Sequence, residues 1–515
     1  MRIAVAYTVL ALCGASVSTA QTLGRVDFPN SGNPAAQPAF LKGVLLLHSF
    51  EYEDAAVAFR EAQAADPGFA MAYWGEALTH THPLWNQQNQ KEALAVLARL
   101  APDAASRRAR AGTERERLYL DAIESLYGDG AKAKRDTLFS AALERITRAH
   151  PDDQEARAFH ALWLMGLSQG NRNVPAYMRA GAIADEIYRR NPEHPGALHY
   201  IIHAFDDPVH APLGLRAARE YSVIAAGADH AQHMTTHIFL ALGMWDETVA
   251  QNAVAAGPDS AGWRPGHYTA WLGYGLLQQG KYRDARRHLE RVRGNLPTPA
   301  RLGPQAYMLG MRAHYLAGTE AWDDGVADWA LDTTISPVGP KAMDAYAVGV
   351  AHLRRGRQAD ANASLARLER YAARAEGDNA YGASPALAAI LLLHFKAELA
   401  LAARTPEEAL RLLSQAAGWA DTLPAEFGPP DIVKPAHERR GEILLELGRA
   451  AEAQREFTHA LALAPGRSRS LWGLGQAALK AGDSAAAERA FAQLRENWKQ
   501  GDSALPAIPE VHGAR

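Results

Sequence analysis

Residues 437–494 read HERRGEILLELGRAAEAQREFTHALALAPGRSRSLWGLGQAALKAGDSAAAERAFAQL and contain one pattern twice. The repeated residues lie 34 positions apart, a period typical of stacked helical hairpins: Gly441, Gly448, Ala453 and Phe457 return as Gly475, Gly482, Ala487 and Phe491. The first glycine lets two helices approach closely, and the second ends the first helix of the pair. The alanine and the phenylalanine fill the space between neighbouring helices. This stretch therefore predicts two antiparallel helix pairs.

The same spacing recurs at the other end and in the middle of the chain. It fits Gly43, Ala55, Phe59, Ala62 and Pro67, then Gly75, Ala93 and Pro102 around an insertion from Thr81 to Gln90, and later Gly273, Gly280, Ala285 and Leu289. Nearly the whole chain therefore resembles tetratricopeptide repeat (TPR) proteins. The resemblance implies an all-α, TPR-type helical solenoid, a right-handed superhelix of about ten to twelve helix pairs. The first helix of each pair would line a concave groove. No segment has a strand pattern.

The N-terminus has the features of a secretory signal peptide. Arg2 precedes a mostly apolar stretch that ends near Cys13, and small residues at Ser18 and Ala20 predict cleavage after Ala20. We therefore expect a periplasmic or secreted protein. The sequence divides into a signal peptide (1–20), an extension (21–35), repeats with a histidine-rich groove (36–260), divergent repeats (261–420), C-terminal repeats (421–502) and a disordered tail (503–515).

Composition narrows the function classes. Cys13 is the only cysteine and leaves with the signal, so the mature chain is predicted to have no disulfide, cysteine-ligated metal or cysteine nucleophile. The net charge is −3 with both signs spread along the chain, which argues against nucleic acid as a partner. No stretch after the signal is long and apolar enough to predict an integral membrane segment.

Histidines concentrate in one part of the chain. Of the 20 histidines, seven lie between residues 194 and 237. Histidines three or four residues apart share one helix face, and the repeat frame places six of them on the groove of three successive repeats: His199, His203, His230, His233, His237 and His267. Imidazoles at this spacing can chelate a transition metal, and copper and zinc are favoured. Four of them can hold one ion; two or three from each of two helices can hold two ions, as in dinuclear copper proteins.

Further polar residues fall near the same face. Asp206 and Asp207 can ligate a metal or fix a histidine tautomer, and the wider set of groove candidates adds His48, His80, His82 and His210. Glu76 is the best placed general base. We expect His194 to be exposed. The aromatic residues are interpreted as packing residues, with Trp85 and Trp263 as the exceptions.

Three strings are more specific than the general repeat. They are AMAYWGEA (70–77), HYIIHAFDDPVHA (199–211) and HMTTHIFLALGMWD (233–246), and they resemble a family of exported bacterial TPR proteins, mostly of unassigned role. This chain has Thr235 and Thr236 where that family is expected to have Pro-Ser. Two hypotheses remain. One is an exported metalloprotein whose metal could act as the centre of an enzyme on a small molecule; the other is a scaffold whose groove binds a peptide or protein partner.

Overall fold

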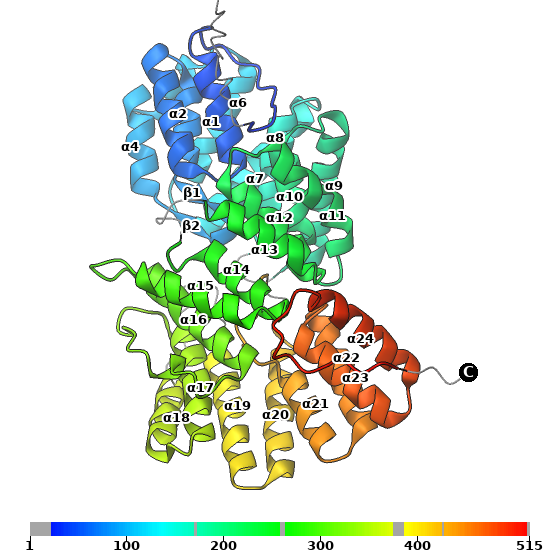
Figure 1. Ribbon diagram of the computed structural model, residues 1–515. Coiled ribbons are helices and arrows are strands. Elements are labelled where there is room, and N and C mark those ends of the chain that lie inside the picture. The colour runs from blue at the N-terminus through cyan, green and yellow to red at the C-terminus, as the bar shows by residue number, and fades with distance from the viewer. Residues whose placement is uncertain (1–21, 169–171, 258–262, 374–385, 425–426, 512–515) are drawn as a thin grey trace, which may run out of the picture.

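The computed structural model describes residues 22–168, 172–257, 263–373, 386–424 and 427–511 (Figure 1). Within these ranges almost all regular structure is helical, which confirms the predicted all-α solenoid. Most helices form antiparallel pairs, and their number lies within the predicted range; α5 and α16 stand outside this pairing. The predicted signal peptide lies outside the described residues.

In the first half of the chain, the described residues form thirteen α-helices and one small sheet. The helices are α1 (Gln37–His48), α2 (Tyr52–Ala65), α3 (Ala70–Leu78), α4 (Gln90–Leu100), α5 (Ala104–Arg110), α6 (Glu114–Leu126), α7 (Lys132–Ala149), α8 (Gln154–Gly166), α9 (Val174–Arg190), α10 (Pro195–Phe205), α11 (Ala211–Ile224), α12 (Asp229–Ala241) and α13 (Trp245–Ala255). The predicted insertion after α3 holds β1 (Thr81–His82), the 3-10 helix η1 (Pro83–Trp85) and β2 (Gln87–Gln88). The two strands pair antiparallel, a short sheet that the sequence did not predict.

The second half continues the array. Its helices are α14 (His267–Gln278), α15 (Tyr282–Gly294), α16 (Leu302–Thr319), α17 (Val338–Arg354), α18 (Gln358–Ala373), α19 (Ala386–Ala402), α20 (Pro406–Ala420), α21 (Ala436–Glu446), α22 (Ala450–Leu463), α23 (Ser468–Ala481) and α24 (Ser484–Asn497), with η2 (Val326–Asp328) between α16 and α17. Among the described helices, none is long and apolar enough to cross a membrane.

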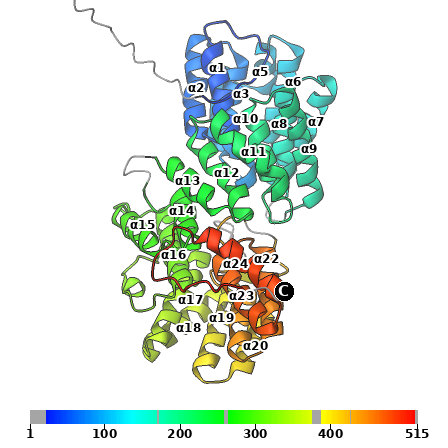
Figure 2. The same ribbon diagram turned by 45° about the vertical axis from the view of Figure 1, so that its right-hand side comes forward.

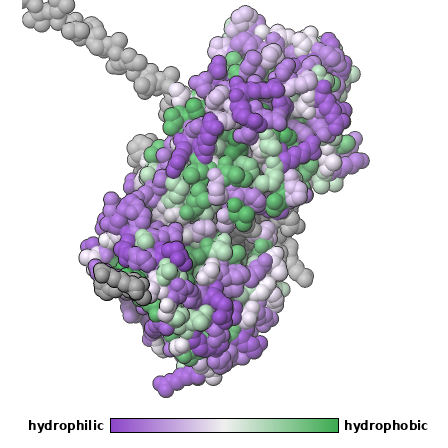
Figure 3. Space-filling model, turned by 90° about the vertical axis from the view of Figure 1, so that its right-hand side faces the viewer, coloured by the Kyte–Doolittle hydropathy of each residue, from purple (hydrophilic) through white to green (hydrophobic). Residues whose placement is uncertain are grey.

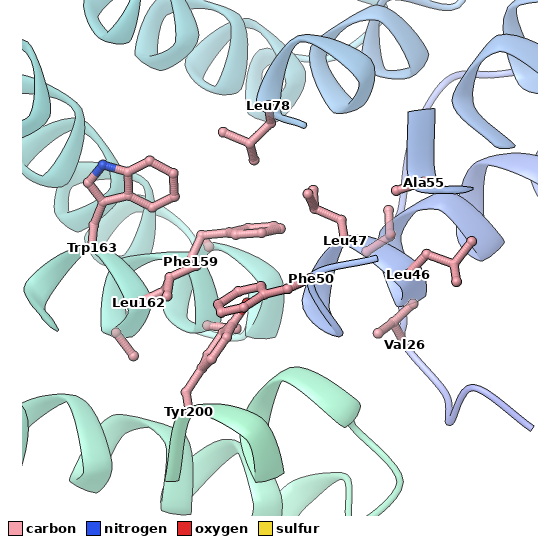
Figure 4. Packing of buried hydrophobic residues seen from close by; sticks show 14 of the residues in the cluster. Val26, Leu46, Leu47, Phe50, Ala55, Leu78, Phe159, Leu162, Trp163 and Tyr200 are labelled. Carbon is pink, nitrogen blue, oxygen red and sulfur yellow. The ribbon is translucent and has the colours of Figure 1, made fainter. Parts of the chain in front are cut away.

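The glycine and phenylalanine of the repeat signature meet between helices. Phe59 on α2 is fully buried, and a Cβ added at Gly43 or Gly75 would lie 2.7 or 2.4 Å from its ring. No side chain fits there, so both glycines are required for the close packing of α1 and α3 on α2. Figure 4 shows the adjoining core, where Leu47 and Phe50 meet Phe159 and Tyr200 from later repeats.

The first and last described residues are packed against the repeats. In the N-terminal extension, Phe28 is buried against Phe40, Trp74 and Tyr119. The tail, predicted to be disordered from residue 503, is instead ordered as far as residue 511. Leu505 reaches Gly280, and the apolar side chains of Ile508 and Val511 pack on the core of the last repeat. Residues 512–515 lie outside the described residues.

The last repeats fold back against the middle of the chain (Figures 1 and 2). The indole of Trp245 donates to the carbonyl of Gly466 (2.9 Å), the guanidinium of Arg467 donates to the Tyr274 hydroxyl (3.0 Å), and the Asp502 amide donates to the Gly280 carbonyl (3.0 Å). The two ends of the second half are therefore joined. On the face shown in Figure 3, apolar side chains gather around the middle of the molecule and polar ones cover its ends.

Candidate metal centre

The structure gathers the six predicted ligands into two groups of three. The first group is His199, His203 and His230, and the second is His233, His237 and His267; within each group, one nitrogen from each ring lies within 4.8 Å of the others. The rings come from α10, α12 and α14, the first helices of three successive pairs. Because the helices present these faces to one another, histidines that are far apart in the sequence meet between them.

The first group has three unpartnered nitrogen atoms. Among the described residues, the Nε2 atoms of His199, His203 and His230 are buried and have no hydrogen-bond partner. The Nδ1–H of His199 donates to the carbonyl of His48 at 2.7 Å, which leaves the Nε2 lone pair of His199 free. Buried polar atoms normally have a hydrogen-bond partner. Three buried nitrogen atoms that converge without such a partner are typical of a site for a metal ion.

The second group is held in one tautomer by its neighbours. The Nδ1–H of His233 donates to Oδ1 of Asn252 at 2.7 Å, and Asn252 is oriented because its own amide donates to the Thr248 carbonyl (2.8 Å). The Nδ1–H of His237 donates to the Asp206 carboxylate at 2.5 Å. Both Nε2 atoms therefore carry lone pairs, and they face each other at 3.1 Å. Two lone pairs at this distance repel unless a proton or a metal ion lies between them.

The two groups adjoin. The ring centroids of His203 and His237 are 5.9 Å apart, and those of His230 and His233 are 6.1 Å apart. One ring of each group, His203 and His267, is only half-buried, whereas the other four are buried. The geometry therefore corresponds to two neighbouring three-histidine sites rather than to one four-histidine site.

Burial favours the neutral form of His199, His203, His230, His233 and His267. Desolvation lowers the pKa of His199, His203, His230 and His233 well below the ordinary value, and neighbouring histidines lower it further. Burial, and after it the interaction with the neighbouring His237, lowers the pKa of His267 to about 3. Neutral imidazole is the form that ligates metals, so the rings are ready for ligation at neutral pH.

Aromatic rings cover both groups. Phe50 lies over the first group, with its centroid 4.2 Å from that of His199. Trp271 covers the second group, 4.4 Å from His237 and 4.8 Å from His233. Trp85, predicted to be an exception among the packing aromatics, is 48% exposed and 6.3 Å from His230. These rings exclude water and leave the histidines few partners.

A third histidine group differs from the first two. The Nε2 atoms of His48 and His194 lie 2.6 and 3.1 Å from the Glu155 carboxylate. Nδ1 of His194 accepts the Ala197 backbone N–H (3.1 Å), and Nδ1 of His48 bonds the Tyr200 hydroxyl (2.8 Å). Every ring nitrogen has a partner, so we interpret this group as a structural network. The expectation that His194 is exposed is wrong: it is fully buried, because Glu155 offers it a charged acceptor.

The two aspartates have separate surroundings. Asp206 accepts the hydrogen bond of His237 and so fixes its tautomer, which is the second of the two roles considered for it. Asp207 accepts the backbone N–H of His210 (2.9 Å) and its Nδ1–H (2.8 Å), and it pairs with Arg172 (2.9 Å). Asp207 and His210 therefore stabilise the turn before α11, and neither is in the two metal-type groups.

Glu76, His80 and His82 lie apart from the six histidines. Arg60 and Arg99 pair with the Glu76 carboxylate, and Gln63 donates to it at 2.6 Å. These partners leave Glu76 poorly placed as a general base for the histidine groups. His80 and His82 line a surface cavity of about 720 Å³ together with Tyr52, Glu53, Arg60 and polar residues of β2.

The sequence did not single out several residues around the centre. Asn252 orients His233, and the Glu51 carboxylate accepts the His230 backbone N–H at 2.9 Å. Burial, partly offset by this hydrogen bond, raises the pKa of Glu51. One feature of the sequence could have drawn attention to Phe50: it stands where glycine ends the equivalent helix of other repeats. The sequence has no such feature at Asn252, because its helix belongs to the outer layer.

Comparison of the chain with known protein families identifies a repeat near its C-terminus. Residues 444–504 match a family model described as tetratricopeptide repeat. Residues 444–504 thus carry the tetratricopeptide repeat that the spacing from Gly441 to Phe491 predicted. No curated protein matches the chain. The finer resemblance to exported, histidine-rich TPR proteins stays a prediction.

Two solved structures are similar over most of their length. The human IFIT1 dimer with m7Gppp-AAAA matches with a TM-score of 0.37 and 11% identity, over 92% of this chain and 90% of that one. The APC/C hetero-tetramer Cut9-Hcn1 matches with a TM-score of 0.34 and 12% identity, over 87% and 78%.

Proposed function

We propose that this protein binds two transition-metal ions side by side, one in each three-histidine group. The observation that carries the proposal is the pair of Nε2 atoms of His233 and His237, 3.1 Å apart, on rings whose Nδ1 atoms both donate elsewhere. The unpartnered Nε2 atoms of the first group support a second ion in the same way. All six donors are imidazoles, which suit copper and zinc.

Three protein ligands leave a coordination position open on each ion. An open position lets an ion activate water or dioxygen, and two adjacent ions can share one small ligand. The protein would then be a metalloenzyme that acts on a small molecule. We place it, with the predicted signal peptide removed, in the periplasm or outside the cell, where extracytoplasmic copper or zinc would load it.

Metal analysis of the mature chain tests this proposal. The protein from Gln21 onward is exported natively, purified without a histidine tag or chelator, and analysed for metals. We expect about two equivalents per chain. The variant His233→Ala with His237→Ala should lose one equivalent and keep its helical circular dichroism, because both rings belong to the second group.

The chain offers a matched control. His437 and His459 stack at 3.9 Å beside Asp421, but Nδ1 of His437 already bonds Glu456 at 2.7 Å. The pair His437→Ala and His459→Ala should therefore keep both equivalents. A wild-type protein that neither contains nor takes up copper or zinc contradicts the proposal.

A second function is binding of a peptide or protein partner, which TPR repeats commonly serve. A cavity of about 500 Å³ among the C-terminal repeats favours it, with Lys434, Arg439 and Arg469 beside Tyr346 and Trp472 in its wall. This cavity is distant in sequence from the six histidines. Unchanged partner capture by the His233→Ala, His237→Ala variant would separate this function from metal binding.

A further inference from the structure

Among the described residues, three helix ends depart from the glycine rule of this chain, with Phe50 after α1, Glu320 after α16 and Arg404 after α19. After α12, α14, α17, α21 and α23 the chain places glycine at positive φ: Gly243 (70°), Gly280 (67°), Gly356 (71°), Gly448 (77°) and Gly482 (83°). After α1 the same place is taken by Phe50, with φ of 58°. A side chain in this left-handed conformation is strained, which is why glycine is usual there.

The hydrogen bonds show that the positions are equivalent. The Phe50 N–H donates to the Leu47 carbonyl (3.1 Å) and the Glu51 N–H to the Leu46 carbonyl (3.0 Å). Gly243 and the residue after it make the same two bonds to the end of α12. Glycine would therefore serve equally well for the backbone at residue 50, so the backbone conformation alone does not account for the phenylalanine ring.

The ring faces the first histidine group. Phe50 is only 7% exposed, and its centroid lies 4.2 Å from His199, 5.8 Å from His203 and 5.6 Å from His230. It thus lies against all three rings of one group. Figure 4 shows it extending from the end of α1 towards Tyr200 on α10.

The other side of the ring faces Tyr52, which stands between Phe50 and the cavity of about 720 Å³. Tyr52 stacks on Phe50 at 5.5 Å with an interplanar angle of 12°, and it stacks on His82 at 3.9 Å. Tyr52 and His82 are both part of the cavity wall. The order in space is therefore cavity, Tyr52, Phe50, and then the histidines of the first group.

We propose that Phe50 is a specificity-determining residue, whose ring closes the cavity side of the ion in the first group to ligands larger than water, dioxygen or azide. This inference rests on the proposed metal function. Larger donors such as phenols and catechols stop in the cavity, where Arg60, Gln87 and Gln88 can bond their polar groups. The ring thereby selects what can coordinate the first ion.

Ligand titration of the copper-loaded mature protein tests this role. The probes are 4-nitrocatechol and azide, followed by absorption, in wild type, Phe50→Gly and Phe50→Leu. We expect 4-nitrocatechol to bind roughly tenfold tighter or more to Phe50→Gly, with azide affinity nearly unchanged and Phe50→Leu close to wild type. Equal 4-nitrocatechol affinity in wild type and Phe50→Gly, with copper retained in both, would overturn the proposal.

Arg404 provides the matched control. It also occupies a helix end at positive φ (60°), but it is exposed and far from the histidines in the array. Arg404→Gly relieves the same kind of backbone strain and should leave both titrations unchanged. A change equal to that of Phe50→Gly would mean that strain relief, not the ring, controls access.

A measurement on the metal-free protein tests the covering role of Phe50 separately from the proposed metal binding. Diethyl pyrocarbonate modifies accessible imidazoles, and peptide mass spectrometry reports its rate at His199 and His230. The rate should rise in Phe50→Gly and not in Arg404→Gly; equal rates refute the covering role. A wild-type protein that holds no copper refutes the proposed function and, with it, any action of Phe50 on a metal.

Discussion

Removal of the Asp206 side chain should weaken one of the two metal sites and spare the other. Asp206 is 2% exposed, and its carboxylate accepts the Nδ1–H of His237 at 2.5 Å. Loss of such a partner typically costs 10- to 100-fold in metal affinity, which corresponds to about 1.4–2.7 kcal/mol. The first group has its own orienting contact, from His199 to the His48 carbonyl, and should keep its affinity.

Two substitutions at this position separate charge from orientation. In Asp206→Ala the Nδ1–H loses its partner, so the ring can rotate or change tautomer. In Asp206→Asn an amide oxygen still accepts the hydrogen bond, so the tautomer is kept and only the charge is lost. We therefore expect a full effect for alanine and a smaller one for asparagine.

Competition with a chelator of known affinity measures this effect. Stepwise titration resolves the two equivalents, and unfolding of the metal-free variants gives the purely structural cost, about 1–3 kcal/mol for an unpaired buried imidazole N–H. Equal weakening of both equivalents would refute the assignment of Asp206 to the second group. No weakening of either would refute its orienting role.

Two further predictions concern the metal-free protein. Its free energy of unfolding should fall as the pH drops below about 6.5, because histidines of the unfolded chain then take up protons while His199, His203, His230 and His233 stay neutral in the folded protein. Each of these residues contributes up to about 1.4 kcal/mol per pH unit. A urea midpoint that does not change between pH 7.5 and 5 would contradict this prediction. Gly196→Ala should lower the free energy of unfolding by about 1–3 kcal/mol and weaken metal binding at the first group, since the new Cβ would lie 2.4 Å from Nδ1 of His48. Thermal unfolding measures this change. The control Gly294→Ala, which has open space around its Cβ, should be neutral in the same assay.

The repeat spacing was sufficient to predict the helical pairs. Glycine and phenylalanine recur because each phenylalanine needs a glycine opposite it, as Phe59 does with Gly75. Histidines at a spacing of three or four residues necessarily share a helix face. The common location of the six candidates could therefore be predicted from local geometry alone.

The division into two groups could not be predicted in the same way. Whether His230 joins His199 or His233 depends on how far α12 is shifted along α10, and that shift is set by packing across the interface. His194 was misplaced for a related reason, because Glu155 approaches it from 39 residues away in sequence. Arg60 and Arg99 likewise reach Glu76 from the flanking helices.

The contact between the last repeats and the middle of the chain changes how the second half should respond to force and heat. A helical array with free ends can extend and contract, because each unit touches only its neighbours. In this protein the C-terminal repeats are instead bonded to the middle of the chain through Trp245, Arg467 and Asp502. Residues 267–502 should therefore melt together rather than fray from the C-terminus.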